Sequence, residues 1–275
     1  MMPTWFLLAI TAAYGLVIGS FINVVIHRLP REQSLLRPRS SCPACGAAIA
    51  WFDNIPVLSY LTLGGRCRHC RAAISPRYPL VELASAGLLV AVAARFGLTV
   101  AGLAAALFVL LLLTLALIDL EHRLLLDVLT LPGIAAGLLL APLGGSLVAP
   151  LGGAVLHSSG PALSALASSL LGAAIGALVP YVVIVGYRLI RGAEGMGLGD
   201  VKFLAMIGVF LGWKGVLLTI GLGSVLGAAV GLGLIAAGRG RRDTELPFGT
   251  FLAAGALLTL FVGGPLMRVL GWIRP

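Results

Sequence analysis

Long apolar runs, separated by short polar or glycine-rich segments, follow one another along almost the whole chain. Eight such runs can be read, at residues 5–26, 80–94, 98–118, 128–147, 163–187, 201–212, 215–237 and 248–270. A helix needs roughly 20 apolar residues to cross the hydrocarbon core of a bilayer. The pattern therefore predicts an all-α polytopic membrane protein with about eight transmembrane helices. The run at 201–212 is short for a crossing, so a re-entrant segment is the alternative there.

One longer polar segment, at residues 27–78, interrupts this pattern. It carries eight arginines against two acidic residues, Glu32 and Asp53. Because basic residues accumulate in cytoplasmic loops, the segment is predicted to be cytoplasmic, and the other basic residues then favour eight crossings with both termini outside. The expected parts are a first helix (1–26), a small cytoplasmic zinc module (27–78) and a membrane domain with about seven spans (79–275).

The composition limits the classes of function that the chain can have. Hydrophobic residues make up 59% of the chain and charged residues 11%, whereas soluble domains carry about 25% charged residues. A large soluble catalytic domain is therefore excluded, and any chemistry lies in or beside the lipid bilayer. The net charge of +9 is assigned to loops that face anionic headgroups, and nucleic acid is not an expected partner.

All four cysteines lie in the polar segment, as Cys42 and Cys45 in CPAC and as Cys67 and Cys70 in CRHC. Two CxxC knuckles can complete a tetrahedral sulfur site for zinc. Two disulfides or a redox CxxC are the alternatives, and a reducing cytoplasm disfavours disulfides. We expect structural zinc, since four thiolates leave no open coordination position. His69 is an alternative ligand.

Two aspartates at the borders of apolar runs are candidate functional residues, because carboxylates are costly there. Asp119 closes FVLLLLTLALID, and Asp200 follows the glycines of GMGLGD. Gly197 and Gly199, like Gly195, lack side chains and let another backbone, including a substrate, approach Asp200 closely. Two carboxylates that share one proton can activate water and protonate a leaving amine, as aspartyl proteases do.

Simpler roles for these carboxylates stay open. Asp119 can pair with Arg123 one turn later, and Asp200 can pair with Lys202 or cap the next helix. Asp127 is either an N-cap or a residue that helps to position the site. The chain contains no HExxH and no GxSxG motif, so metalloprotease and serine-nucleophile mechanisms have no support.

Several motifs together resemble the bacterial prepilin peptidases, the type IV prepilin leader peptidases with N-methyltransferase activity. They are GSFINVVIHRLPR, CPAC, NIPVLSYL, CRHC, ISPRYPLVEL, IDLEHRLLLDVLTLP and GMGLGDVKFLAMIG, and they cover nearly the full chain. The last resembles the GxGD signature of intramembrane aspartyl proteases. The chain departs from the family at Leu126, where the family commonly has proline.

The resemblance implies that Asp119 and Asp200 are the catalytic pair in a bacterial inner-membrane enzyme. Its substrates would be prepilins and pseudopilins, of type IV pili and type II secretion, cleaved at the cytoplasmic membrane boundary. It also implies methylation of the new N-terminus by S-adenosylmethionine, which the residues alone do not show. The candidates for that step are Asn23, Arg28, Arg77, Tyr78 and Glu82. A peptidase without methylation, a proton- or cation-coupled transporter and a membrane scaffold are the alternatives.

Overall fold

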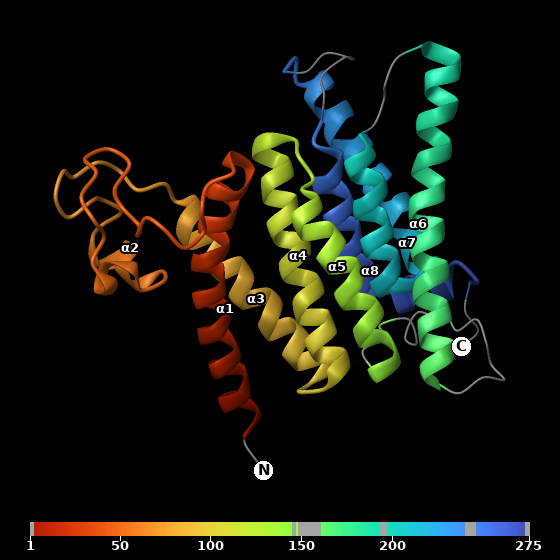
Figure 1. The fold of residues 1–275 in the computed structure, drawn as a ribbon, viewed down its shortest axis with the longest axis horizontal. Helices are drawn as coiled ribbons and strands as arrows, with labels where there is room; N and C mark the ends of the chain where they lie inside the picture. The colour runs from red at the N-terminus through yellow and green to blue at the C-terminus, as the bar shows by residue number, and fades with distance from the viewer. Residues whose placement is uncertain (1–2, 145–146, 148–160, 193–196, 240–245, 273–275) are drawn as a thin grey trace. The chain divides into compact units, whose positions relative to one another are not determined.

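The computed structural model describes residues 3–144, 147, 161–192, 197–239 and 246–272. They belong to two compact units, Met1–Gly97 and Leu98–Pro275. Within the described ranges every regular element is a helix (Figure 1), and β-pairing is limited to the isolated bridges Ser41–Ala48 and Arg66–Ala73. The predicted all-α class is therefore confirmed.

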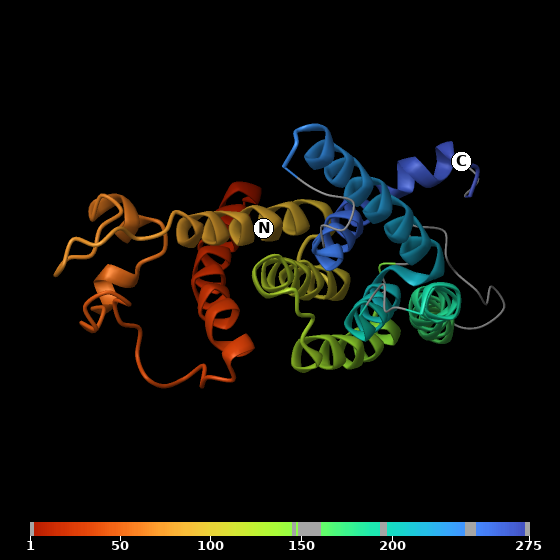
Figure 2. The ribbon, with the colours of Figure 1, turned by 90° about the horizontal axis from the view of Figure 1, so that it is seen from above.

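In the first unit, α1 (Thr4–Arg28) packs against α3 (Arg77–Phe96) at close range. A Cβ added at Gly15 would lie 2.5 Å from the Cα of Ala86, and one at Gly19 would lie 2.6 Å from the Cα of Glu82. Small residues four positions apart let two helices approach in this way. The loop-rich segment between them, in orange in Figures 1 and 2, contains three short helices. These are η1 (Leu29–Arg31), η2 (Trp51–Asn54) and α2 (Leu58–Thr62).

The second unit is a bundle of longer helices, visible side by side in Figure 1. Its elements are α4 (Val100–His122), α5 (Asp127–Leu140), η3 (Ala141–Leu143), α6 (Pro161–Arg191), α7 (Leu198–Ala236) and α8 (Phe248–Val269). Phe108 of α4 stacks on Phe210 of α7 with ring centroids 4.7 Å apart. Helices α6 and α7 meet at their backbones, since a Cβ at Gly172 would lie 2.1 Å from the carbonyl oxygen of Gly208.

Among the described residues, six helices are long and apolar enough to cross a membrane: α1, α3, α4, α6, α7 and α8. The predicted runs 201–212 and 215–237 form one helix, α7, which departs from helical geometry at Gly212 with φ of +68°. The run predicted at 128–147 corresponds to the shorter apolar helix Asp127–Leu143. The predicted class, an α-helical membrane protein with several spans, is confirmed. The number of eight crossings stays a prediction.

The close approach of α6 and α7 leads to a stability prediction. We expect Gly208→Ala to lower the free energy of unfolding by about 2 kcal/mol or more. The added methyl group meets the backbone of Gly172, which cannot rotate away as a side chain can. Gly221→Ala on the same helix is the control, because nothing lies within 4 Å of a Cβ at that position. Thermal unfolding in lipid nanodiscs compares the two variants, and equal midpoints would contradict the prediction.

Candidate active site

Asp119 lies near the end of α4 and is only 5% exposed. Its Oδ2 atom accepts a hydrogen bond from the backbone N–H of Thr250 at 2.7 Å and lies 3.1 Å from the Thr250 hydroxyl. Thr250 belongs to the first turn of α8, where backbone N–H groups have no acceptor within their own helix. Asp119 therefore accepts one of the N–H groups at the N-terminus of α8 that the helix itself leaves unpaired.

Asp200 lies in the first turn of α7 and is partly buried. Its carboxylate interacts electrostatically with that of Asp119, so the fold brings together the two aspartates singled out in the sequence. The neighbours of the two aspartates test the simpler roles of ion pairing and helix capping. Lys202 Nζ binds Asp127 Oδ2 at 2.6 Å rather than Asp200, whereas the Asp200 carboxylate accepts a hydrogen bond from the backbone N–H of Gly197, the N-cap residue of α7. Arg123 does interact electrostatically with Asp119.

Glycines surround the two carboxylates. A Cβ at Gly199 would lie 3.1 Å from the Cβ of Leu125, and one at Gly197 would lie 3.9 Å from Asp200 Oδ2. Gly249, which the sequence analysis missed, is the tightest of the three, because its Cβ would lie 3.0 Å from Asp119 Oδ2. Gly195 lies outside the described residues.

Asp127 is the first residue of α5, and the N-cap position of that helix is taken by Leu126. Its ion pair with Lys202 instead ties α5 to the first turns of α7. Thr250 was also missed by the sequence analysis. The one feature of the sequence that could have pointed to Thr250 is its position directly after the Pro-Phe-Gly segment at the start of the last apolar run.

The four cysteines form one cluster in the first unit. Their Sγ atoms all lie within 4.8 Å of one another, none is in a disulfide, and the Cys42 and Cys70 sulfurs are 3.8 Å apart. A tetrahedral site with Zn–S bonds of about 2.3 Å has sulfurs about 3.8 Å apart. The donor set and its spacing therefore fit a closed tetrahedral metal site, in which His69 is not needed.

Two equivalent turns build this cluster. The Cys42 N–H donates to Ala47 O at 2.9 Å, and the Cys67 N–H donates to Ala72 O at the same distance. Each turn also needs a residue with positive φ, and the chain places Gly46 (φ +71°) in one turn and Arg71 (φ +61°) in the other. Glycine is suited to that backbone conformation and arginine is not.

Backbone donors and neighbouring sulfurs move the cysteine pKa values in opposite directions. N–H groups of Cys45 and Ala44 lower the pKa of Cys42 to about 6. The Ala72 N–H also lowers the pKa of Cys70, but desolvation and the other three sulfurs outweigh it and raise that pKa to about 11. A bound cation would favour the thiolate form of every ligand, so the cluster has the electrostatics of a cation site.

An ion pair holds the second cysteine turn against the rest of the segment. The guanidinium of Arg68 donates two hydrogen bonds to the carboxylate of Asp53, at 2.7 and 2.6 Å, and lies over the ring of Phe52. The hydrogen bond and charge of Arg68 lower the pKa of Asp53. The carboxylate is therefore committed to this pair and is not a free acidic group in the module.

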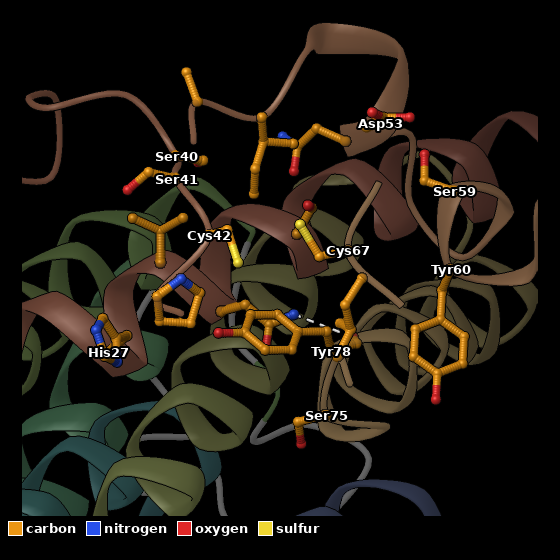
Figure 3. Close-up of a pocket in the computed structure, with 18 of the residues that line it drawn as sticks. His27, Ser40, Ser41, Cys42, Asp53, Ser59, Tyr60, Cys67, Ser75 and Tyr78 are labelled. Carbon is orange, nitrogen blue, oxygen red and sulfur yellow. Dashed lines mark hydrogen bonds between the residues drawn. The ribbon is translucent and has the colours of Figure 1, made fainter. Parts of the chain in front are cut away.

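A pocket of about 890 Å³ lies in the first unit and is bordered by both the cysteine turns and the α1–α3 pair. Figure 3 shows Cys42 and Cys67 close together on its wall, with the ring of Tyr78 nearby. Four of the five predicted methyl-transfer residues line it, namely Asn23, Arg28, Tyr78 and Glu82. Arg77 is the fifth predicted residue, and it is not part of the pocket lining.

Asn23 and Glu82 are buried polar groups of this pocket, 2% and 7% exposed. The Asn23 amide Nδ2 donates to the carbonyl oxygens of Gly19 at 3.3 Å and Tyr78 at 3.1 Å, and its Oδ1 has no hydrogen-bond partner among the described residues. Glu82 Oε2 accepts from the backbone N–H of Val57 at 2.7 Å. A buried acceptor without a donor is rare, so Asn23 Oδ1 is suited to a ligand N–H.

Arg28 has a different part in the same pocket. Its guanidinium donates to the carbonyl oxygens of Ser34 at 3.0 Å and Pro38 at 2.8 Å. These bonds fix the loop that leads into the first cysteine turn. The hydrogen bonds of Arg28 thus shape the pocket wall, to which Asn23 and Glu82 also belong.

Known proteins resemble the chain over nearly its full length. A family model described as the bacterial peptidase A24 N-terminal domain matches residues 13–96, and the type IV leader peptidase family model matches residues 106–232. A protein of Burkholderia pseudomallei named prepilin leader peptidase/N-methyltransferase is 40% identical, over 98% of this chain and 90% of its own. Proteins with the same name from Aeromonas hydrophila and Pseudomonas aeruginosa are each 38% identical. These two matches cover 96% and 94% of this chain and 93% and 91% of the related proteins. No solved structure matches the chain.

Proposed function

Because the chain belongs to the type IV leader peptidase family, we propose that it removes leader peptides from prepilins and pseudopilins and then methylates the new N-terminus. The juxtaposition of Asp119 and Asp200, supplied by α4 and α7, carries the peptidase part. The protein is a multi-pass membrane protein, which suits substrates of type IV pili and type II secretion, whose scissile bond lies beside an apolar helix.

Hydrolysis by the aspartate pair needs one shared proton. The ionised carboxylate takes a proton from water, whose oxygen then attacks the scissile carbonyl carbon, while the protonated carboxyl donates its proton to the carbonyl oxygen. The C–N bond then breaks as the leaving amine takes a proton from the pair, and one hydroxyl of the tetrahedral intermediate returns a proton to the pair. Gly197 leaves room beside Asp200 for an extended substrate backbone, which supports its assignment as a substrate-approach residue, whereas the space at Gly199 is taken up by Leu125. Asp127 would act indirectly, through Lys202 and the start of α7.

We assign the methyl-transfer step to the pocket of the first unit. S-adenosylmethionine, when bound, supplies an electrophilic methyl group. Asn23 Oδ1 would accept a ligand N–H, and Glu82 would hold the substrate amine and take the proton that it loses on methylation. Tyr78 completes this wall of the pocket, and Arg28 fixes its loop. Arg77 stays a weaker candidate.

Zinc is the metal that we propose for Cys42, Cys45, Cys67 and Cys70, in a structural role. The arginines of the module support a cytoplasmic position for the pocket and for the aspartate pair, with both termini outside. This is the side on which a basic leader would be held. The newly exposed amine and the methylation pocket would then lie on the same side of the membrane.

The test of both activities is mass spectrometry of a synthetic prepilin, incubated with the lipid-reconstituted protein and S-adenosylmethionine. We expect loss of the leader and gain of one methyl group on the new N-terminus. Cleavage without methylation would reduce the function to a peptidase, and an intact substrate from several pilin types would contradict the proposal.

Glu82→Gln separates the two steps. We expect methylation to fall about 100-fold, the usual contribution of a general base, while cleavage stays within about twofold. Asp119 and Asp200 belong to the other compact unit, which is the reason for that difference. Glu32→Gln, an exposed acid of the same unit, is the matched control and should keep both activities. Equal losses of cleavage and methylation in Glu82→Gln would show that Glu82 acts on stability.

A further inference from the structure

Thr250 contacts the candidate catalytic Asp119 through two different groups. The backbone N–H donates to Asp119 Oδ2 at 2.7 Å. The hydroxyl oxygen lies 3.1 Å from the same Oδ2 and 3.0 Å from the carbonyl oxygen of Ala116, one turn earlier on α4. The side chain thus lies between two acceptors of the same helix.

A hydroxyl group has one proton, so it can donate to only one of these two acceptors at a time. While Asp119 is ionised, the Thr250 hydroxyl can donate to Oδ2, which then receives two hydrogen bonds. When Oδ2 carries a proton, the carboxyl becomes the donor, and the hydroxyl can accept from it while donating to Ala116 O. A rotation about the C–O bond of Thr250 is the only movement required.

We propose that Thr250 is a positioning residue that satisfies Asp119 in both of its protonation states. The inference rests on the proposed aspartyl mechanism, in which a carboxylate takes up a proton and returns it in each turnover. A buried carboxyl group without such a partner would lose a hydrogen bond in one of the two states, and each loss would raise the barrier to proton transfer. Thr250 removes that penalty without touching the substrate.

The charged groups around Asp119 cannot act as its hydrogen-bond partner in both protonation states. Asp200 faces it from α7 and Arg123 from the end of α4, whereas the first turn of α8 contains no acidic residue. Asp200 shares the reacting proton, and arginine can donate but not accept. Among the described contacts of Asp119, the Thr250 hydroxyl is thus the neutral group that can both donate a hydrogen bond and accept one.

Thr250→Val tests this role, because valine has nearly the same shape and keeps the backbone N–H. We expect kcat for prepilin cleavage to fall roughly 10- to 100-fold, the equivalent of one hydrogen bond to a charged group. KM should stay unchanged, since Thr250 acts on the reacting proton rather than on substrate binding. Thr250→Ser keeps the hydroxyl and should restore kcat to within about threefold.

Thr259→Val is the matched control on the same helix. Its hydroxyl is buried, donates to Gly255 O at 2.8 Å and lies 3.2 Å from the Thr219 hydroxyl, so the substitution removes a hydrogen-bonded hydroxyl elsewhere on α8. We expect its kcat to stay within about twofold. A Thr250→Val enzyme with the same kcat as Thr259→Val would overturn the inference, as would a Thr250→Ser enzyme no better than Thr250→Val.

The Asp→Asn variants distinguish a failure of this inference from a failure of the proposed function. If Asp119→Asn and Asp200→Asn still cleave, the aspartyl mechanism itself is wrong. If both are inactive and Thr250→Val cleaves normally, the aspartates are catalytic and only the role of Thr250 is wrong.

Discussion

Asp200→Asn is expected to abolish leader cleavage, with kcat reduced at least about 1,000-fold. Asparagine is nearly isosteric but can neither take a proton from water nor return one to the leaving amine. The Asp200 carboxylate accepts a hydrogen bond from the Gly197 N–H at the start of α7, and the side-chain oxygen of asparagine can keep that bond, so the helix should form as before. Mass spectrometry of a synthetic prepilin measures cleavage, and thermal unfolding in nanodiscs verifies the fold.

Asp119→Asn should be equally inactive but less simple to interpret. If the new amide NH2 group took the place of Oδ2, it would face the N–H of Thr250, which is a donor opposite a donor. We therefore expect a lower unfolding midpoint in this variant than in Asp200→Asn. Glu121→Gln, an exposed acid next to the end of α4, is the control and should cleave normally. Cleavage above a few per cent of the parent rate in either aspartate variant would remove that residue from the catalytic pair.

Loss of the metal site is expected to have the second large effect, and mainly on methylation. In the double variant Cys42→Ser with Cys45→Ser, two of the four ligands are lost, and metal binding should fall below detection. A module this small depends on its metal for folding, and Cys42 and Cys67 border the same pocket as Asn23 and Glu82. We expect methylation to fall at least about 100-fold, in proportion to the loss of the folded module, and cleavage to fall much less.

Elemental analysis of the purified protein gives the metal content, and the prepilin assay gives both activities. His69→Ala is the control for metal content, because His69 lies outside the sulfur cluster, and it should retain one equivalent of zinc. Equal losses of cleavage and methylation in the double cysteine variant would mean that the metal supports the whole protein. Full metal content in that variant would show that the four cysteines are not the ligands.

Much of the fold follows from local patterns in the sequence. The apolar runs predict the positions of the long helices to within a few residues, because a helix satisfies its own backbone hydrogen bonds and needs only apolar side chains to lie in lipid. The exception is α7, where the kink at Gly212 lies at the predicted boundary between two runs, yet the helix continues on both sides of it. Whether a helix restarts directly or after a loop depends on packing that the pattern does not contain.

Local sequence is enough to identify the groups that are chemically unusual for their surroundings. These are the two aspartates at the ends of apolar runs and the two CxxC pairs, whose turns form through hydrogen bonds between residues five apart. It also led to Asn23 and Glu82, through family resemblance rather than through a physical pattern. In each case the evidence lies within a short stretch of chain, where spacing alone restricts what the residues can do.

Which distant groups meet depends on the packing of the helices. Lys202 binds Asp127 and not its near neighbour Asp200, and Asp119 receives its hydrogen bonds from Thr250 on another helix. The close backbone approach at Gly19 places Glu82 against α1, where it lines the same pocket as Asn23. Such pairings depend on the rotation and spacing of packed helices, to which many weak contacts contribute. A local residue pattern does not contain the combined effect of these contacts, so the partners of a catalytic group can be identified only from the packed helices.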